Sequence, residues 1–129
     1  MVLRPGAEVV LVSTGTQTSR TMDACHRLIQ AGFEVGLVHV PFLKPLDTSS
    51  LYEAIRHSRL VVSVEEHTTI GGLGGAVAEV IAEKGGPRLR RIGIDDVFGE
   101  SGTNDDLLER FGLSPASIVE RVQAWMDGN

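Results

Sequence analysis

Apolar runs alternate along the chain with segments in which apolar residues recur at helical spacing. Four of the runs are expected to form β-strands: Ala7 to Gly15, Phe33 to Val40, Arg59 to Glu65 and Arg88 to Ile94. The first is nearly continuous, which is typical of a strand that is covered on both faces of a sheet. The fourth contains three arginines and therefore fits an edge position better than a central one.

The segments between and after these strands predict helices. Good capping residues or glycine stops bound them: Gly32 ends the first, Asp47 or Thr48 begins the second, and Gly85 to Pro87 ends the third. Two closing helices are expected, one from Thr103 to Gly112 and one opened by Ser114 and Pro115. Their apolar stripes are Met22, Cys25, Leu28 and Ile29; Leu51, Ala54 and Ile55; Ile70, Leu73, Val77, Val80 and Ile81; Leu107, Leu108 and Phe111; and Ile118, Val122 and Trp125.

Strands that alternate with helices predict a three-layer α/β/α domain with a mostly parallel sheet. We assign residues 7–126 to one such domain and residues 127–129 to a tail. Residues 1–6 have the weakest pattern, and their Arg-Pro-Gly sequence suggests a linker from a preceding domain.

The composition and charge of the chain argue against nucleic acid and membranes as partners. Twelve basic residues against seventeen acidic ones give a net charge of −5, and no stretch gathers lysine and arginine, which argues against nucleic acid as a partner. The chain shows neither a leader pattern nor an apolar run of about 18 residues, so we expect a cytoplasmic protein with no membrane contact. The single cysteine, Cys25, is interpreted as a small buried hydrophobe.

The sequence "IGGLGGAVAE" resembles a phosphate-binding turn but has the wrong spacing for one. A dinucleotide fingerprint needs a third glycine where Val77 stands, and Glu65 and Glu66 would repel a phosphate. Asp95 and Asp96 occupy the place of a ribose-binding acid, which leaves nucleotide binding open as an alternative. We favour close packing of a helix as the reason for these glycines.

Complete catalytic or metal-binding motifs are absent from the sequence. The chain has no Walker A sequence, no HExxH pattern and no serine within Gly-x-Ser-x-Gly. His67 stands out because it follows two glutamates at the carboxyl end of a strand, where α/β sheets place their contacts. It is either a pH-sensitive donor to a neighbouring site or a surface imidazole paired with a local carboxylate.

Several longer motifs, in their order along the chain, carry a resemblance to a known family. They are "VSTGTQT", "KPLD", "EEHTTIGGLGGAVAE", "FGESGTNDDLLERFGL" and "GLSPASIVERVQAWM". Together they resemble the C-terminal domain of the transketolase family of thiamine diphosphate enzymes, to which deoxyxylulose phosphate synthases and dehydrogenase β subunits are related. The resemblance covers Ala7 to Met126, and "FGESG" favours transketolase over the synthases.

The resemblance implies a five-stranded sheet with one antiparallel strand. The strand missing from our count of four would lie near Val2 and Leu3 or between Gly93 and Phe98. The family's Gly-Asp-Gly motif with a later Asn-Asn is absent, as is the glutamate-bearing pyrimidine domain. By resemblance this chain therefore holds no catalytic, cofactor or metal residue, and thiamine diphosphate and Mg²⁺ belong to the complete enzyme.

The expected function is that of an accessory domain of a transketolase-like transferase, inactive alone and active in assembly. Its expected partners are the missing diphosphate- and pyrimidine-binding domains, in a homodimeric enzyme. The turn that would face the partner or the active site is formed by Glu66, His67, Gly71, Gly72, Gly74 and Gly75. The alternative is a stand-alone α/β module that binds a small ligand or a nucleotide.

Overall fold

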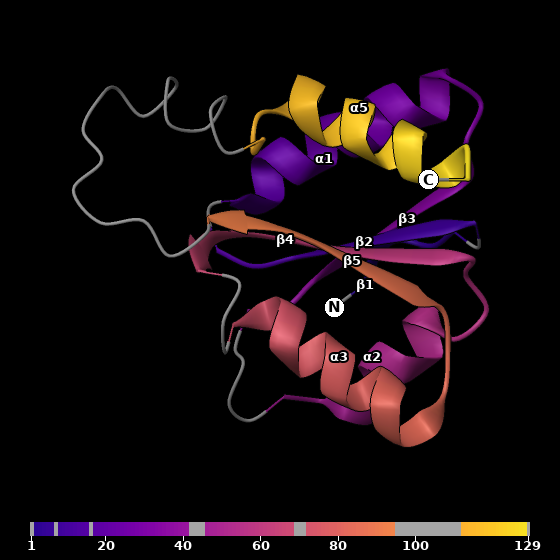
Figure 1. The fold of residues 1–129 in the computed structure, drawn as a ribbon, viewed down its shortest axis with the longest axis vertical. Coiled ribbons are helices and arrows are strands. Elements are labelled where there is room, and N and C mark those ends of the chain that lie inside the picture. Colours follow the sequence, from indigo (N-terminus) through magenta and orange to yellow (C-terminus); the bar gives the residue numbers. More distant parts are fainter. Residues whose placement is uncertain are drawn as a thin grey trace.

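Five strands form one sheet between two layers of helices in the computed structural model, which describes residues 2–6, 8–15, 17–41, 46–68, 72–94 and 112–128. The strands are β1 (Val2–Arg4), β2 (Val9–Ser13), β3 (Val35–His39), β4 (Leu60–Thr68) and β5 (Arg88–Ile94). The described helices are α1 (Gln17–Gln30), α2 (Thr48–Ile55), α3 (Leu73–Lys84) and α5 (Pro115–Met126). Helices α1 and α5 cover one face of the sheet, and α2 and α3 cover the other (Figure 1). The three-layer prediction is confirmed.

The strand order is β1-β3-β2-β4-β5, in which every pair is parallel except β1 with β3. Of the two places left open for the fifth strand, the one near Val2 and Leu3 is therefore correct. The segment expected to be a linker contributes this edge strand. That another domain precedes it stays a prediction.

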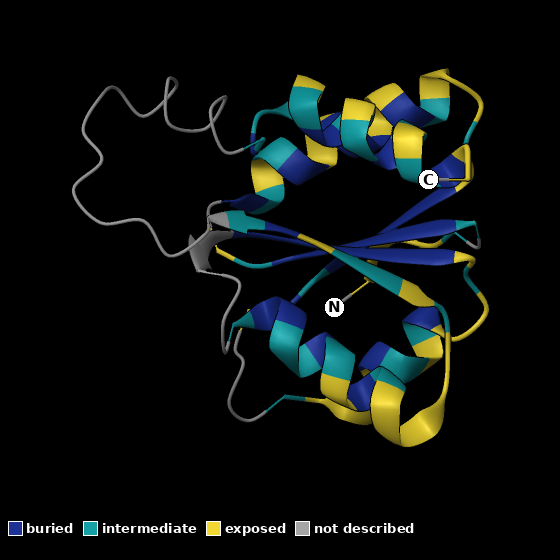
Figure 2. Cartoon of the chain, in the orientation of Figure 1, coloured by how far each residue is buried: buried dark blue, intermediate teal, exposed yellow. Residues whose placement is uncertain are grey.

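The central strands β2 and β4 explain the near-continuous apolar runs, because helices cover them on both sides. Val9 and Leu11 of β2 face the core under α1 and α5, whereas Val10 and Val12 face the core over α2 and α3. All four are at most 1% exposed, and Figure 2 shows the buried strands as the dark centre of the fold. Each such side chain contributes about 2 kcal/mol by leaving water.

The capping predictions hold where the structure describes them. Asp47 caps the start of α2, and its carboxylate accepts hydrogen bonds from the Ser50 backbone N–H at 3.0 Å and from the Ser50 hydroxyl at 2.8 Å. These bonds, the backbone one foremost, hold the pKa of Asp47 below its usual value. Ser114 caps α5 ahead of Pro115, and the predicted helix from Thr103 to Gly112 lies, but for Gly112, outside the described residues.

Helix α1 departs from its predicted stripe at one position. Met22 is 37% exposed, whereas Cys25 and Leu28 are buried as expected. The buried face follows Gln17, Thr21, Ala24, Cys25 and Leu28, so Met22 lies at its margin. Burial raises the pKa of the Cys25 thiol, and the charge of Arg4 partly offsets that rise, which agrees with its role as a small hydrophobe.

Within the described part of the chain, the helices are too short or too polar to cross a membrane.

Candidate functional site

The carboxyl edge of the sheet holds the glycine-rich connection between β4 and α3. The last residues of β4 before this connection pair irregularly with β5, with a register shift between Val64 and Thr68. Glu65 lies in this stretch, and its side chain is only 1% exposed. One carboxyl oxygen accepts a hydrogen bond from the Leu73 N–H and the other from the Gly74 N–H, both at 2.9 Å.

Glu65 therefore occupies the N-terminus of α3 with a carboxyl group of its own chain. The first N–H groups of a helix have no partner within the helix, and in nucleotide-binding turns a phosphate accepts from them. Here two of these donors are already satisfied, so a phosphate would have to displace a buried side chain. From the sequence we interpreted Glu65 only as a source of repulsion and missed its role as a cap.

The glycine at position 74 allows α3 to approach the sheet closely. A Cβ atom on Gly74 would lie 2.4 Å from Cδ of Arg91 and 3.0 Å from Oγ of Ser63. Ser63 is fully buried, and its hydroxyl has no hydrogen-bond partner among the described residues. A Cβ on Gly75, by contrast, would meet no atom within 4 Å. The close packing that we favoured thus requires Gly74 and not Gly75.

Replacing Gly74 with valine should lower the free energy of unfolding by about 2 kcal/mol, because a branched side chain would push α3 from the sheet. Gly75→Ala is the matched control, and it should raise the free energy of unfolding by up to about 1 kcal/mol, since alanine favours a helix more than glycine does. Urea unfolding followed by circular dichroism measures both. Equal stability of the two variants would contradict the packing role of Gly74.

A second polar cluster lies where β2 and β3 end. The Ser13 hydroxyl donates to Oγ1 of Thr18 at 2.9 Å, and Thr18 Oγ1 lies 2.7 Å from Nδ1 of His39. The Gln17 amide donates to the Leu113 carbonyl at 3.0 Å and is itself buried. These bonds tie the start of α1 to the neighbouring strand and to the segment before α5.

This cluster was not predicted as a unit from the sequence. The available signal was that Ser13 and His39 both end a buried strand, since parallel neighbours end at the same edge of a sheet. The hydroxyl of Ser13 donates to another hydroxyl and not to the imidazole, so the chain of bonds is no serine–histidine pair of the nucleophilic kind. Among the described residues, no group of three or more His, Cys, Asp or Glu side chains could hold a metal ion.

The residues predicted to face a partner are placed as follows. The strand expected to end at Glu65 runs to Thr68, so Glu66 and His67 lie within β4 and not in a turn; their side chains lie outside the description. Gly71, Asp95 and Asp96 also fall outside the described residues. Gly72 is half-buried at the start of α3 and Gly75 is half-buried on its open side, whereas Gly74 faces the sheet of its own domain.

Comparison with known proteins gives one consistent family. The model of the family "Transketolase, C-terminal domain" matches residues 1–118. One subunit of the apulose-4-phosphate transketolase of Actinobacillus succinogenes is 41% identical over 121 residues, which are 92% of this chain and 39% of that protein. The 1-deoxy-D-xylulose-5-phosphate synthase of a Synechococcus strain is 39% identical over 125 residues, which are 95% of this chain and 19% of the synthase.

Among solved structures, one described as "split gene transketolase, inactive beta4 tetramer", where beta4 denotes subunits and not a strand, superposes with a TM-score of 0.90. It is 39% identical in sequence, and the match covers 98% of this chain and 42% of that one. The chain thus spans less than half of the length of each of these three proteins.

Proposed function

Because this chain belongs to the transketolase C-terminal domain family, we propose that it acts as the C-terminal accessory domain of a transketolase-like enzyme. The complete enzyme would use thiamine diphosphate to transfer a ketol group between sugar phosphates. The observation that carries the proposal is the match to a C-terminal domain over residues 1–118, together with the limited share of each relative that the chain spans.

The polar groups of the described carboxyl edge support a structural role for this domain. Diphosphate does not fit at the start of α3, because the Glu65 carboxyl group holds the N–H groups of Leu73 and Gly74. We therefore assign thiamine diphosphate and Mg²⁺ to the diphosphate- and pyrimidine-binding domains of the complete enzyme, and no reaction step to the described residues of this chain.

The proposal includes a role in assembly for the turn after β4. Glu66 and His67 lie near the carboxyl end of the central strand β4, and Gly71, Gly72 and Gly75 come after them in the sequence; α/β sheets make their contacts at this end of their strands. Gly74, in the first turn of α3, packs inside the domain and lets α3 lie close to the sheet. We further propose that the complete enzyme is a cytoplasmic homodimer, in which this turn faces the other domains or the second subunit.

The direct test combines the chain with the diphosphate- and pyrimidine-binding domains of the complete enzyme, prepared as a separate polypeptide. Calorimetry on the chain alone, with Mg²⁺ present, should detect no binding of thiamine diphosphate at tens of micromolar, a concentration range that reveals most specific sites. The combined polypeptides should transfer a ketol group between sugar phosphates, whereas the chain alone should not. Cofactor binding by the chain alone, or activity that is the same without it, would contradict the accessory role.

The turn itself is tested by His67→Ala. We expect weaker association with the preceding domains, or lower turnover of the assembled enzyme, with an unchanged melting temperature of the chain. Glu83→Ala, at an exposed position near the end of α3, is the control and should change none of these. Unaltered association and turnover in His67→Ala would remove this residue from the contact.

A further inference from the structure

Strand β1 exposes apolar side chains to both sides of the sheet. Among the described residues, the large hydrophobic side chains that are exposed are Val2 at 51%, Leu3 at 42% and Met22 at 37%. Val2 and Leu3 are neighbours in β1, and Met22 of α1 lines the same hollow as Leu3. The exposed hydrophobic side chains are therefore gathered around one strand. In most monomeric proteins such side chains are scattered singly over the surface.

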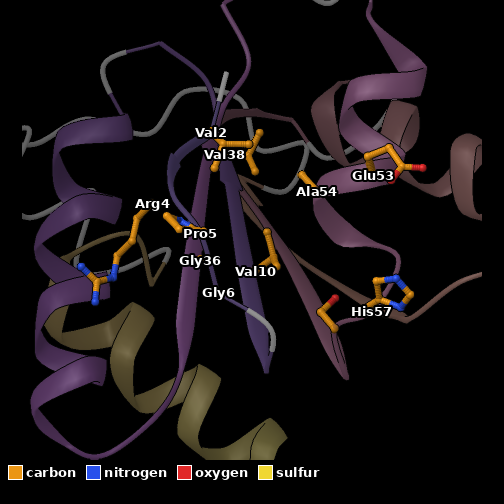
Figure 3. Close-up of a pocket in the computed structure, with 11 residues that line it drawn as sticks. Val2, Arg4, Pro5, Gly6, Val10, Gly36, Val38, Glu53, Ala54 and His57 are labelled. Carbon is orange, nitrogen blue, oxygen red and sulfur yellow. The ribbon is translucent and has the colours of Figure 1, made fainter.

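A hollow lies on each side of this strand. The first, of about 290 Å³, lies between the sheet and α2 and is lined by Val2, Val10, Val38 and Ala54, with Glu53 and His57 at the helix side (Figure 3). The second, of about 230 Å³, lies between β1 and α1 and is lined by Leu3, Pro5, Met22, Cys25, His26 and Leu37. Arg4 borders both.

The two edges of the sheet differ in chemistry. The edge strand β5 carries Arg88, Arg90 and Arg91, and charged side chains of this kind keep an edge from pairing with other chains. The edge strand β1 has a single charged residue, Arg4, and is otherwise apolar. β1 is only three residues long and is followed by Pro5, and both features hinder pairing with a further strand, so a polypeptide that covers β1 would pack against its exposed apolar side chains.

We propose that β1 and its two flanking hollows, together the β1 flank, form the docking surface for the domain that precedes this one in the complete enzyme. The inference rests on the proposed function. The family is that of a C-terminal domain, and the match covers only 39% of the Actinobacillus protein, so most of that relative is available to lie ahead of it. Residue 2 is already in the sheet, and one residue of extended chain spans at most about 3.6 Å. Any chain ahead of residue 2 therefore enters this domain at the β1 flank.

The shape of the β1 flank favours this occupant over a second copy of the chain. Two copies that paired through β1 would extend the sheet edge to edge and leave the hollow on each face open. A larger, different body can instead wrap the strand and bury Val2 on one face and Leu3 with Met22 on the other. Arg4, Glu53 and His57 then form the polar rim that surrounds the apolar centre of most interfaces.

Met22 supplies a probe that needs no substitution, because oxidation of methionine by hydrogen peroxide follows its exposure. In the chain alone, Met22 should oxidise about tenfold faster than Met126, which is 8% exposed and serves as the internal reference. On adding the preceding domains as a separate polypeptide, oxidation of Met22 should slow about tenfold while that of Met126 stays constant. Peptide mass spectrometry measures both rates.

Two variants test the same surface by affinity. Leu3→Asp and Met22→Gln remove apolar contacts from exposed positions, so each should weaken association by about tenfold or more without lowering the melting temperature. Ala82→Asp, at an exposed position of α3, is the control and should leave the affinity unchanged.

The outcomes separate this inference from the proposed function. Association that leaves Met22 open and is unaffected by Leu3→Asp would overturn the β1 flank as the docking surface and leave the accessory role intact. A lack of any association with the preceding polypeptide would overturn both. Protection of Met22 in the chain alone as its concentration rises, with dimers seen by sedimentation, would assign the surface to a second copy and overturn our choice of occupant.

Discussion

Gly6→Ala is expected to lower the free energy of unfolding by about 3 kcal/mol or more, the upper end of the range for overpacking. A Cβ atom at this position would lie 2.3 Å from the Gly36 nitrogen and 2.4 Å from the Val35 carbonyl carbon. Both are backbone atoms of β3, so no side-chain rotation relieves the contact. The chain between β1 and β2 would have to move away from the sheet, which would also displace β1.

The reciprocal change should be milder. A Cβ on Gly36 would lie 2.9 Å from the Gly6 nitrogen and 3.2 Å from its oxygen. Urea unfolding should therefore rank Gly6→Ala below Gly36→Ala in stability and place Gly75→Ala, which adds its methyl group to open space, at or above the wild type. A Gly6→Ala protein as stable as the wild type would show that the backbone at Gly6 is not tightly packed against β3 in solution.

Glu65→Ala is the second change with a large expected effect. It removes the two hydrogen bonds that the carboxyl group accepts at 2.9 Å and leaves the N–H groups of Leu73 and Gly74 buried without a partner. Each such donor costs about 1–3 kcal/mol, so we expect a loss of about 3 kcal/mol in unfolding free energy. Hydrogen exchange at the first amides of α3 should accelerate more than exchange in β2.

Glu65→Gln separates the hydrogen bonds from the volume of the side chain. The amide oxygen can accept one of the two bonds, whereas its NH₂ group would face the second donor, so the loss should lie between those of wild type and Glu65→Ala. Glu79→Ala, on an exposed part of α3, should change stability by less than about 0.5 kcal/mol. If Glu65→Ala behaved like Glu79→Ala, the capping role would be wrong.

Glu65 and Gly6 each lie beside a surface that we propose contacts another part of the complete enzyme. Glu65 fixes the start of α3, and it directly precedes Glu66 and His67 in β4, the residues that we propose face the partner. Gly6 fixes the path of the chain directly after β1, beside the hollow that we assign to the preceding domain. Both therefore support surfaces whose contacts we propose, and variants of either should also weaken assembly.

The sequence by itself determined the layers and most of the elements. Apolar runs such as Val9 to Ser13 and Leu60 to Val64 can be satisfied only by cover on both faces, which requires helices on both sides of a parallel sheet. Capping residues act on their own neighbours, so Ser114 could be identified without any tertiary information, and the cap of α2 could be narrowed to Asp47 or Thr48. The family motifs added the antiparallel strand, although they left two places for it.

Only the tertiary structure decided what depends on residues far apart along the chain. The short segment Val2–Arg4 carries too little pattern to mark a strand, and its pairing with Val38 and Leu37 is a long-range contact. The same holds for position 6, where the backbone of Gly36 lies too close for any side chain. It holds also for Met22, which stays exposed at the margin of the buried face of α1.

Glu65 shows the same limit at the candidate site. It has the same side chain and charge as Glu66, and it becomes a cap because β4 places its carboxyl group against the first N–H groups of α3. Periodicity is a local property of the chain, whereas a close approach or a shared hydrogen bond depends on where the fold brings two distant segments together.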